Sequence, residues 1–188
     1  MVKLRKNPPK KIGTGYKLFM LKKNKLYLPM VANPDASSTP VGVWIDASAA
    51  PRAADSKTGR PRVRGGGKGT HSRGVTLAYR PGWHLGEIPY APQFHNKQGR
   101  LPDCFVWALC EYAADIDYQE EAESYGYNKN GKFIHSYAGL PKIPVDGCYR
   151  YRTNPNPNTP EWIISGAIKV LRILKNEEVE MLLSSRKD

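Results

Sequence analysis

Hydrophobic residues along the chain fall mostly into short runs, separated by segments rich in Gly, Pro, Asn and Lys. Short runs bounded by turn residues are typical of strands. The pattern predicts a β-hairpin over 16–31, turned at Lys22-Lys-Asn-Lys25. It predicts a central strand over 104–112, which is apolar at successive positions and therefore suits burial on both faces. Further strands or extended pieces are predicted at 41–45, 75–79, 87–91, 147–152, 161–164 and 167–174.

Only two helices are predicted. Asp117 and Glu120 have the spacing of a capping box, which indicates the start of a short helix that Gly126 ends. Asn176 is predicted to cap a second helix, with two acids in its first turn, where the helix dipole favours them. Many strands and few short helices predict an α+β fold, mostly antiparallel, with long loops.

The domain organisation expected from the sequence is simple. Residues 1–13 are rich in Lys, Arg, Asn and Pro, and we expect them to form a flexible basic N-terminus. Residues 14–188 are predicted to form a single domain, with one long basic loop at 46–74 and a turn-rich element at 80–86.

The charge is large and unevenly distributed. The net charge is +12, with nine Lys or Arg and no acid in residues 1–25. Residues 52–73 hold seven Lys or Arg against one acid, whereas residues 111–123 hold six acids and no base. Basic segments of this kind either neutralise the phosphates of a nucleic acid or act as solvated loops that keep a protein soluble. The sequence leaves both interpretations open, and an acidic protein is a further candidate partner.

Several classes are disfavoured. No apolar run has the length of a membrane span, and the basic start is not followed by the apolar stretch of a secretory signal. The three cysteines, Cys104, Cys110 and Cys148, form no C-x-x-C pair, and the four histidines lack metal-ligand spacing. We therefore expect no disulfide framework, no metal site and a reducing cytoplasm, bacterial or of a phage-infected host.

The segment 77–91 concentrates residues that suit a nucleotide. Gly82 and Gly86 allow a ligand to approach the backbone closely, Tyr90 offers a flat face, and Arg80 is suited to pairing with a phosphate. The alternative is structural, with the aromatic residues in the core and His84 as a hydrogen-bonded turn residue.

Glu161 is the second candidate residue. It follows the proline-rich turn 154–158 and opens an apolar strand, so its carboxylate can project from a strand end into a cleft. A carboxylate that is merely solvated is the alternative.

Together these segments resemble ADP-ribosyltransferases of the His-Tyr-Glu type, such as the poly-ADP-ribose polymerases. Gly86-Glu-Ile-Pro-Tyr-Ala91 is similar to the strand that carries the family's Tyr. Phe105-Val-Trp-Ala-Leu-Cys-Glu111 is similar to the apolar strand that follows. Glu161-Trp-Ile-Ile164 resembles the strand opened by the family's catalytic Glu. The basic loop and Tyr79–Gly86 also resemble modules in polyvalent proteins of phages and mobile elements.

The resemblance implies a split, mostly antiparallel β-core and NAD as the substrate. It implies that Tyr90 stacks on the nicotinamide and that Glu161 hydrogen-bonds the nicotinamide ribose and stabilises the oxocarbenium-like transition state. The family's His lies on its first core strand, and the corresponding segment, Tyr16–Phe19, has none. Either His84, as a catalytic residue, or Arg80 takes over its role, or the nucleotide is held differently, or the domain has lost transferase activity.

The resemblance also implies cofactor-binding residues. Gly82 or Gly86 would hold the carboxamide of the nicotinamide through its backbone, and Arg80 or His84 would reach the pyrophosphate or the adenosine ribose. The acceptor of ADP-ribose stays open. An alternative is a non-enzymatic, nucleic-acid-associated protein of phage or mobile-element origin that binds through the basic segments 1–25 and 52–73.

Overall fold

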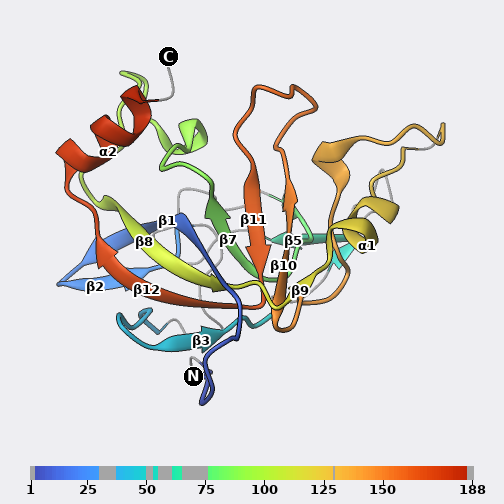
Figure 1. The fold of residues 1–188 in the computed structure, drawn as a ribbon. Coiled ribbons are helices and arrows are strands. Elements are labelled where there is room, and N and C mark those ends of the chain that lie inside the picture. Colours follow the sequence, from blue (N-terminus) through green and yellow to red (C-terminus); the bar gives the residue numbers. More distant parts are fainter. Residues whose placement is uncertain are drawn as a thin grey trace.

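The structure is a computed structural model that describes residues 3–29, 37–49, 53–54, 61–64, 76–128 and 130–185. Its fold is α+β, and it is built on a mostly antiparallel sheet of nine strands (Figure 1), as the sequence predicts. Eight strands follow the order β3-β12-β8-β1-β7-β11-β10-β9, and β2 pairs with β1. Their bounds are β1 Ile12–Lys22, β2 Lys25–Tyr27, β3 Trp44–Asp46, β7 Trp83–Gly86, β8 Phe105–Ala113, β9 Ile116–Asp117, β10 Gly147–Tyr151, β11 Trp162–Ser165 and β12 Ala167–Ile173.

The centre of the sheet is the antiparallel pair β1–β8, which is in register from Ile12 opposite Ala113 to Met20 opposite Phe105. Successive residues of a strand point to opposite faces. Accordingly Phe19 belongs to one buried cluster and Leu18 to another. The prediction of a central strand over 104–112, buried on both faces, is confirmed. The predicted hairpin is confirmed as well, with β1 and β2 joined across Lys23 and Asn24.

The two α-helices lie near opposite ends of the sheet (Figure 1). Helix α2 (Asn176–Ser184) packs Val179 and Leu182 on the cluster that contains Leu18. Helix α1 (Gln119–Ser124) lies beside β10. Its predicted capping box does not form, because the Asp117 carboxylate accepts from the backbone N–H of Gln119. Within the described part of the chain, no helix has both the length and the apolar character needed to cross a membrane.

The long loop expected at 46–74 is only partly a loop. It contains the short strands β4 (Ala53–Ala54) and β5 (Pro61–Arg64), which join β6 (Thr76–Ala78) in a separate three-stranded sheet. Strands this short, in an Ala- and Arg-rich segment without apolar alternation, leave no periodic signal. Of the basic residues predicted as a nucleic-acid contact in 52–73, only Arg62 and Arg64 lie in the described residues.

The turn-rich element predicted at 80–86 includes a central strand. Strand β7 lies between β1 and β11, and its side chains Trp83 and Leu85 are buried. The Pro81-Gly82 pair indicates a turn in the sequence, and that turn occurs just before the strand rather than through it.

Part of the basic N-terminal segment forms specific contacts. Leu4 forms a bridge with Ile45, and the backbone N–H of Arg5 donates to the carbonyl of Trp44 at 2.9 Å. The Arg5 guanidinium pairs with Asp46 and Asp146. These contacts attach residues 3–5 to the edge strand β3.

Candidate functional site

Strands β7 and β11 bring together two segments that the sequence singles out. Gly86 is paired with Trp162, and His84 with Ile164. The backbone N–H of Glu87 donates to the carbonyl of Glu161 at 3.1 Å. The segment expected to bind the nucleotide and the expected catalytic Glu therefore lie side by side on adjacent, hydrogen-bonded strands.

The Glu161 carboxylate lies between three cationic or potentially cationic groups. Its Oε1 is 3.1 Å from Nη2 of Arg152 and 3.2 Å from Nε2 of His135, and its Oε2 is 3.5 Å from Nη1 of Arg150. The side chain of Glu161 is 19% exposed. A carboxylate held in this way keeps a fixed orientation while one side remains open to a ligand.

These residues line a cleft of about 610 Å³, which is within the usual range for small-molecule sites. Arg150 lies on β10 and Arg152 just after it, so the two arginines project from the same side of the strand. Asp117, Gln119 and Glu123, from β9 and α1, complete the polar wall of the cleft. We refer to this site as the Glu161 cleft.

Arg80 holds the loop that carries His135. Its Nε donates to the carbonyl oxygen of Ala138 at 2.9 Å, and a terminal nitrogen donates to that of Ser136. The guanidinium carbon lies 4.2 Å from the centre of the Tyr151 ring. Arg80 was expected to bind a phosphate of the cofactor, and in the structure it contacts its own protein instead.

His84 is also engaged within the fold. Its Nε2 lies 2.8 Å from the carbonyl oxygen of Arg80, and its Nδ1 lies 3.4 Å from the Tyr151 hydroxyl. Burial, reinforced by the positive charge of Lys17, lowers the pKa of His84 to about 3. The imidazole is therefore neutral at pH 7, and it does not line the Glu161 cleft.

Packing explains both glycines that were expected to approach a ligand. A Cβ on Gly82, which has φ of +144°, would lie 2.5 Å from Cγ2 of Ile164. A Cβ on Gly86 would lie 2.6 Å from the carbonyl oxygen of Ile88. The close approach that these glycines permit is an approach of the protein to itself.

Tyr90 lies in a different cleft from Glu161. It is 40% exposed, and its ring meets that of His95 edge to face, with centroids 5.9 Å apart. With Trp162 and the polar loop 153–160 it lines a second cleft of about 310 Å³. Glu161 and Trp162 are adjacent residues and line different clefts. The structure therefore does not bring Tyr90, His84 and Glu161 to one pocket.

The three residues that contact the Glu161 carboxylate were not predicted from the sequence as members of the site. Arg150 and Arg152 carry a signal, because Tyr149-Arg-Tyr-Arg152 alternates aromatic and basic residues and so places both arginines on one face of a strand. His135 carries none, since it begins the short 3-10 helix η2 (His135–Tyr137), 26 residues before its partner in the sequence.

Comparison with known proteins gives no match to a family model, a curated protein or a solved structure. Among the residues that the structure describes, no three His, Cys, Asp or Glu side chains are grouped as a metal site would require. The geometry of the Glu161 cleft is therefore the basis for a proposed function.

Proposed function

We propose that the protein binds NAD in the Glu161 cleft and breaks the bond between nicotinamide and ribose, passing ADP-ribose to an acceptor or to water. The observation that supports this proposal most is the Glu161 carboxylate, which lies in an open cleft beside two arginines and an imidazole. This residue opens the strand that resembles the catalytic strand of ADP-ribosyltransferases.

The chemistry follows from charge. As the bond between the ribose C1′ and the nicotinamide nitrogen breaks, nicotinamide leaves with the electron pair and the ribose acquires oxocarbenium character. The Glu161 carboxylate stabilises that positive charge. The acceptor oxygen then adds to C1′ and releases one proton, which a neighbouring imidazole such as His135 can accept. Arg150 and Arg152 suit the pyrophosphate, because guanidinium groups bind phosphates through paired hydrogen bonds.

Of the residues expected from the sequence to form the site, Glu161 retains its role, and other residues take the roles of His84 and Arg80. His135 takes the place of His84 as the imidazole, and Arg150 and Arg152 take the place of Arg80.

The direct test is NAD turnover by three forms of the protein. Glu161→Gln keeps the size of the side chain and should lower turnover about 10²–10³-fold, the usual loss when one electrostatic partner of the transition state is removed. Glu123→Gln is the matched control, because Glu123 lines the same cleft but bonds to Gln119 and not to the arginines. Turnover that survives Glu161→Gln undiminished contradicts the mechanism.

The second candidate is a binding protein without catalysis. The separation of Tyr90 from Glu161 favours it, because the aromatic face expected beside the nicotinamide lines another cleft. NAD binding without turnover, measured with water and with protein or nucleic-acid acceptors, would select this second function.

A further inference from the structure

The basic residues of segment 1–25 have three different environments. Lys3 and Arg5 pair with acids of the fold, and Lys17 is buried. By contrast Lys22, Lys23 and Lys25, at the turn between β1 and β2, are exposed. Within the described residues no acidic side chain forms an ion pair with these three lysines.

The turn fixes the backbone positions of these lysines. Lys23 and Asn24 have φ of 50° and 57°, which is the geometry of a two-residue type I′ hairpin loop. Lys22 and Lys25 stand directly opposite each other in the register. Like charges directly opposite across two strands destabilise a hairpin. The described part of the fold does not compensate this repulsion with an acid, whereas a bound anion would.

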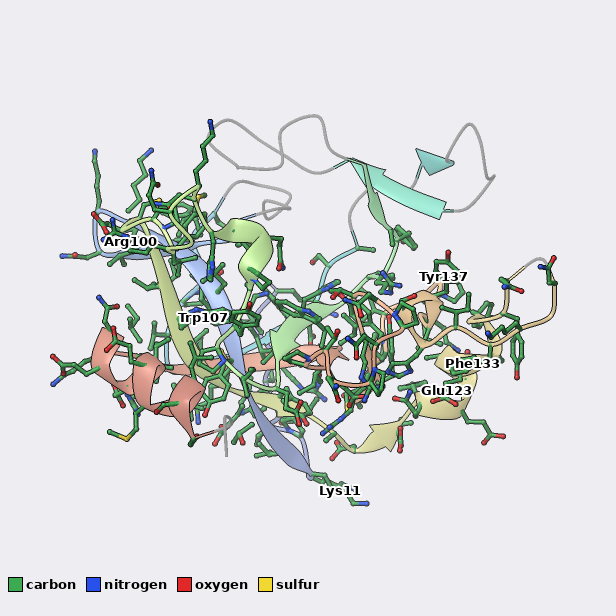
Figure 2. All side chains as sticks on the ribbon, turned by 90° about the horizontal axis from the view of Figure 1, so that it is seen from above. Lys11, Arg100, Trp107, Glu123, Phe133 and Tyr137 are labelled. Atoms are coloured by element: carbon green, nitrogen blue, oxygen red, sulfur yellow. The ribbon has the colours of Figure 1, made fainter. Side chains whose placement is uncertain are left out.

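A second basic turn lies on the same edge of the molecule. The backbone N–H of Leu21 donates to the carbonyl of Cys104 at 2.8 Å, which joins the hairpin to the loop that carries Lys97 and Arg100. The Asn96 side chain shapes that loop by accepting from the backbone N–H of Arg100 at 3.0 Å. Figure 2 shows Arg100 on the same side of the molecule as the β1–β2 hairpin, and Figure 1 shows this loop above the hairpin, beside α2.

We propose that this basic edge is a contact surface for the phosphate backbone of a nucleic acid. The residues of the basic edge are Lys22, Lys23, Lys25, Lys97 and Arg100. Two fixed turns that present cations along one edge match a row of phosphates, and contacts of this type bind without reading sequence. An acidic protein is the competing partner. Binding to polyglutamate, measured beside binding to DNA, distinguishes an acidic protein from a nucleic acid.

The basic edge is independent of the proposed NAD site. Tyr16 of β1 lies opposite Gly86, which is itself paired with Trp162. Lys22 is six residues further along β1, a distance of about 20 Å in an extended strand. A nucleic acid at the basic edge therefore leaves the Glu161 cleft open, and either inference can fail without the other.

The test is the salt dependence of binding to a short DNA duplex and to its single strand, measured by fluorescence anisotropy on the full chain. The triple variant Lys22→Gln, Lys23→Gln, Lys25→Gln should reduce the slope of log Kd against log salt by about two to three, close to one for each phosphate that is no longer neutralised. The double variant Lys97→Gln, Arg100→Gln should reduce it by about one to two.

The matched control is the triple variant of Lys6, Lys10 and Lys11 to Gln. These three lysines are exposed and belong to the same basic segment, and their substitution removes the same charge as the first triple variant. The slope of this control should change by less than about one. An equal reduction in both triple variants, or no binding by the unmodified protein, overturns the proposal. Binding to polyglutamate but not to DNA overturns it in favour of an acidic protein. Circular dichroism confirms that each variant is folded.

Discussion

The ammonium group of Lys17 donates a hydrogen bond to the carbonyl oxygen of His84 at 2.9 Å, inside the sheet. The same nitrogen lies 5.4 Å from the centre of the Trp83 ring and 5.7 Å from that of Phe19. Lys17 is only 7% exposed, and no acid of the described residues forms an ion pair with it. One hydrogen bond and two ring faces thus compensate for the water that this charge has lost.

This environment predicts a pH-dependent contribution to stability. Burial lowers the pKa of Lys17 from 10.5 to about 8, so between these values the unfolded chain holds a proton that the folded protein has released. Stability contributed by Lys17 therefore rises with pH across this window, by about 3 kcal/mol in full. Compared with Lys17→Met, the unmodified protein should gain this amount between pH 7 and 10.5 in urea unfolding. A difference between the two proteins that stays constant over this range would contradict the prediction.

His84 predicts a second pH-dependent contribution to stability, at the acid end of the pH range. Its pKa is about 3 in the folded protein against 6.5 for the free side chain, so the unfolded chain protonates first on acidification. Stability from a neutral His84 is therefore lost as pH falls from about 6.5 towards 3, by about 5 kcal/mol in full. His84→Phe should be less stable at pH 7, because it leaves the Arg80 carbonyl unpaired, but its deficit should shrink in acid. A deficit independent of pH would show that folding leaves the pKa of His84 unchanged.

Arg80 is expected to position the site without touching a ligand. Arg80→Met leaves the carbonyls of Ser136 and Ala138 without this donor, which should cost about 1–3 kcal/mol. Hydrogen exchange should rise at the Gly139 amide, which bonds to the Ala122 carbonyl beside this loop. Arg100→Met, at an exposed position, should change neither quantity. A stable Arg80→Met protein with unchanged exchange would contradict the positioning role.

The two clefts predict different effects on NAD affinity. Arg152→Gln should weaken NAD binding about tenfold, because it removes a charge-assisted hydrogen bond to phosphate. Tyr90→Ala should leave the affinity nearly unchanged, since Tyr90 lines the other cleft. The measurement is the rise in melting temperature with NAD, which reports binding to the native state. A much weaker affinity in Tyr90→Ala would instead support the stacking role expected from the sequence.

The sheet was predictable from the sequence where strands are long and apolar. The run 104–112 and the hairpin turned at Lys23 and Asn24 follow from local pattern alone. Strand β7 did not follow, because its four residues come directly after Pro81-Gly82 and alternate a buried Trp and Leu with His and Gly. Its place between β1 and β11 depends on partners distant in the sequence, which local propensity does not encode.

The candidate site divides in the same way. Glu161 was predictable from its position at the start of a strand, and it does line a cleft. Arg80, Gly82 and His84 have chemistry that suits a nucleotide, but the fold uses that chemistry internally. A guanidinium that binds two carbonyls and one that binds a phosphate look alike in sequence. Only the three-dimensional contacts distinguish them.

The pairing of β1 with β8 also affects how the protein is made. Ile12 pairs with Ala113, so about a hundred residues must be synthesised after Ile12 before the β1–β8 pair at the centre of the sheet can form completely. During that interval the β1–β2 hairpin exposes apolar side chains on both faces, and an isolated hairpin is at best marginally stable. Strand β12 then covers the other side of β8. Slow, chaperone-assisted maturation of the nascent chain is the expected consequence of this long-range architecture.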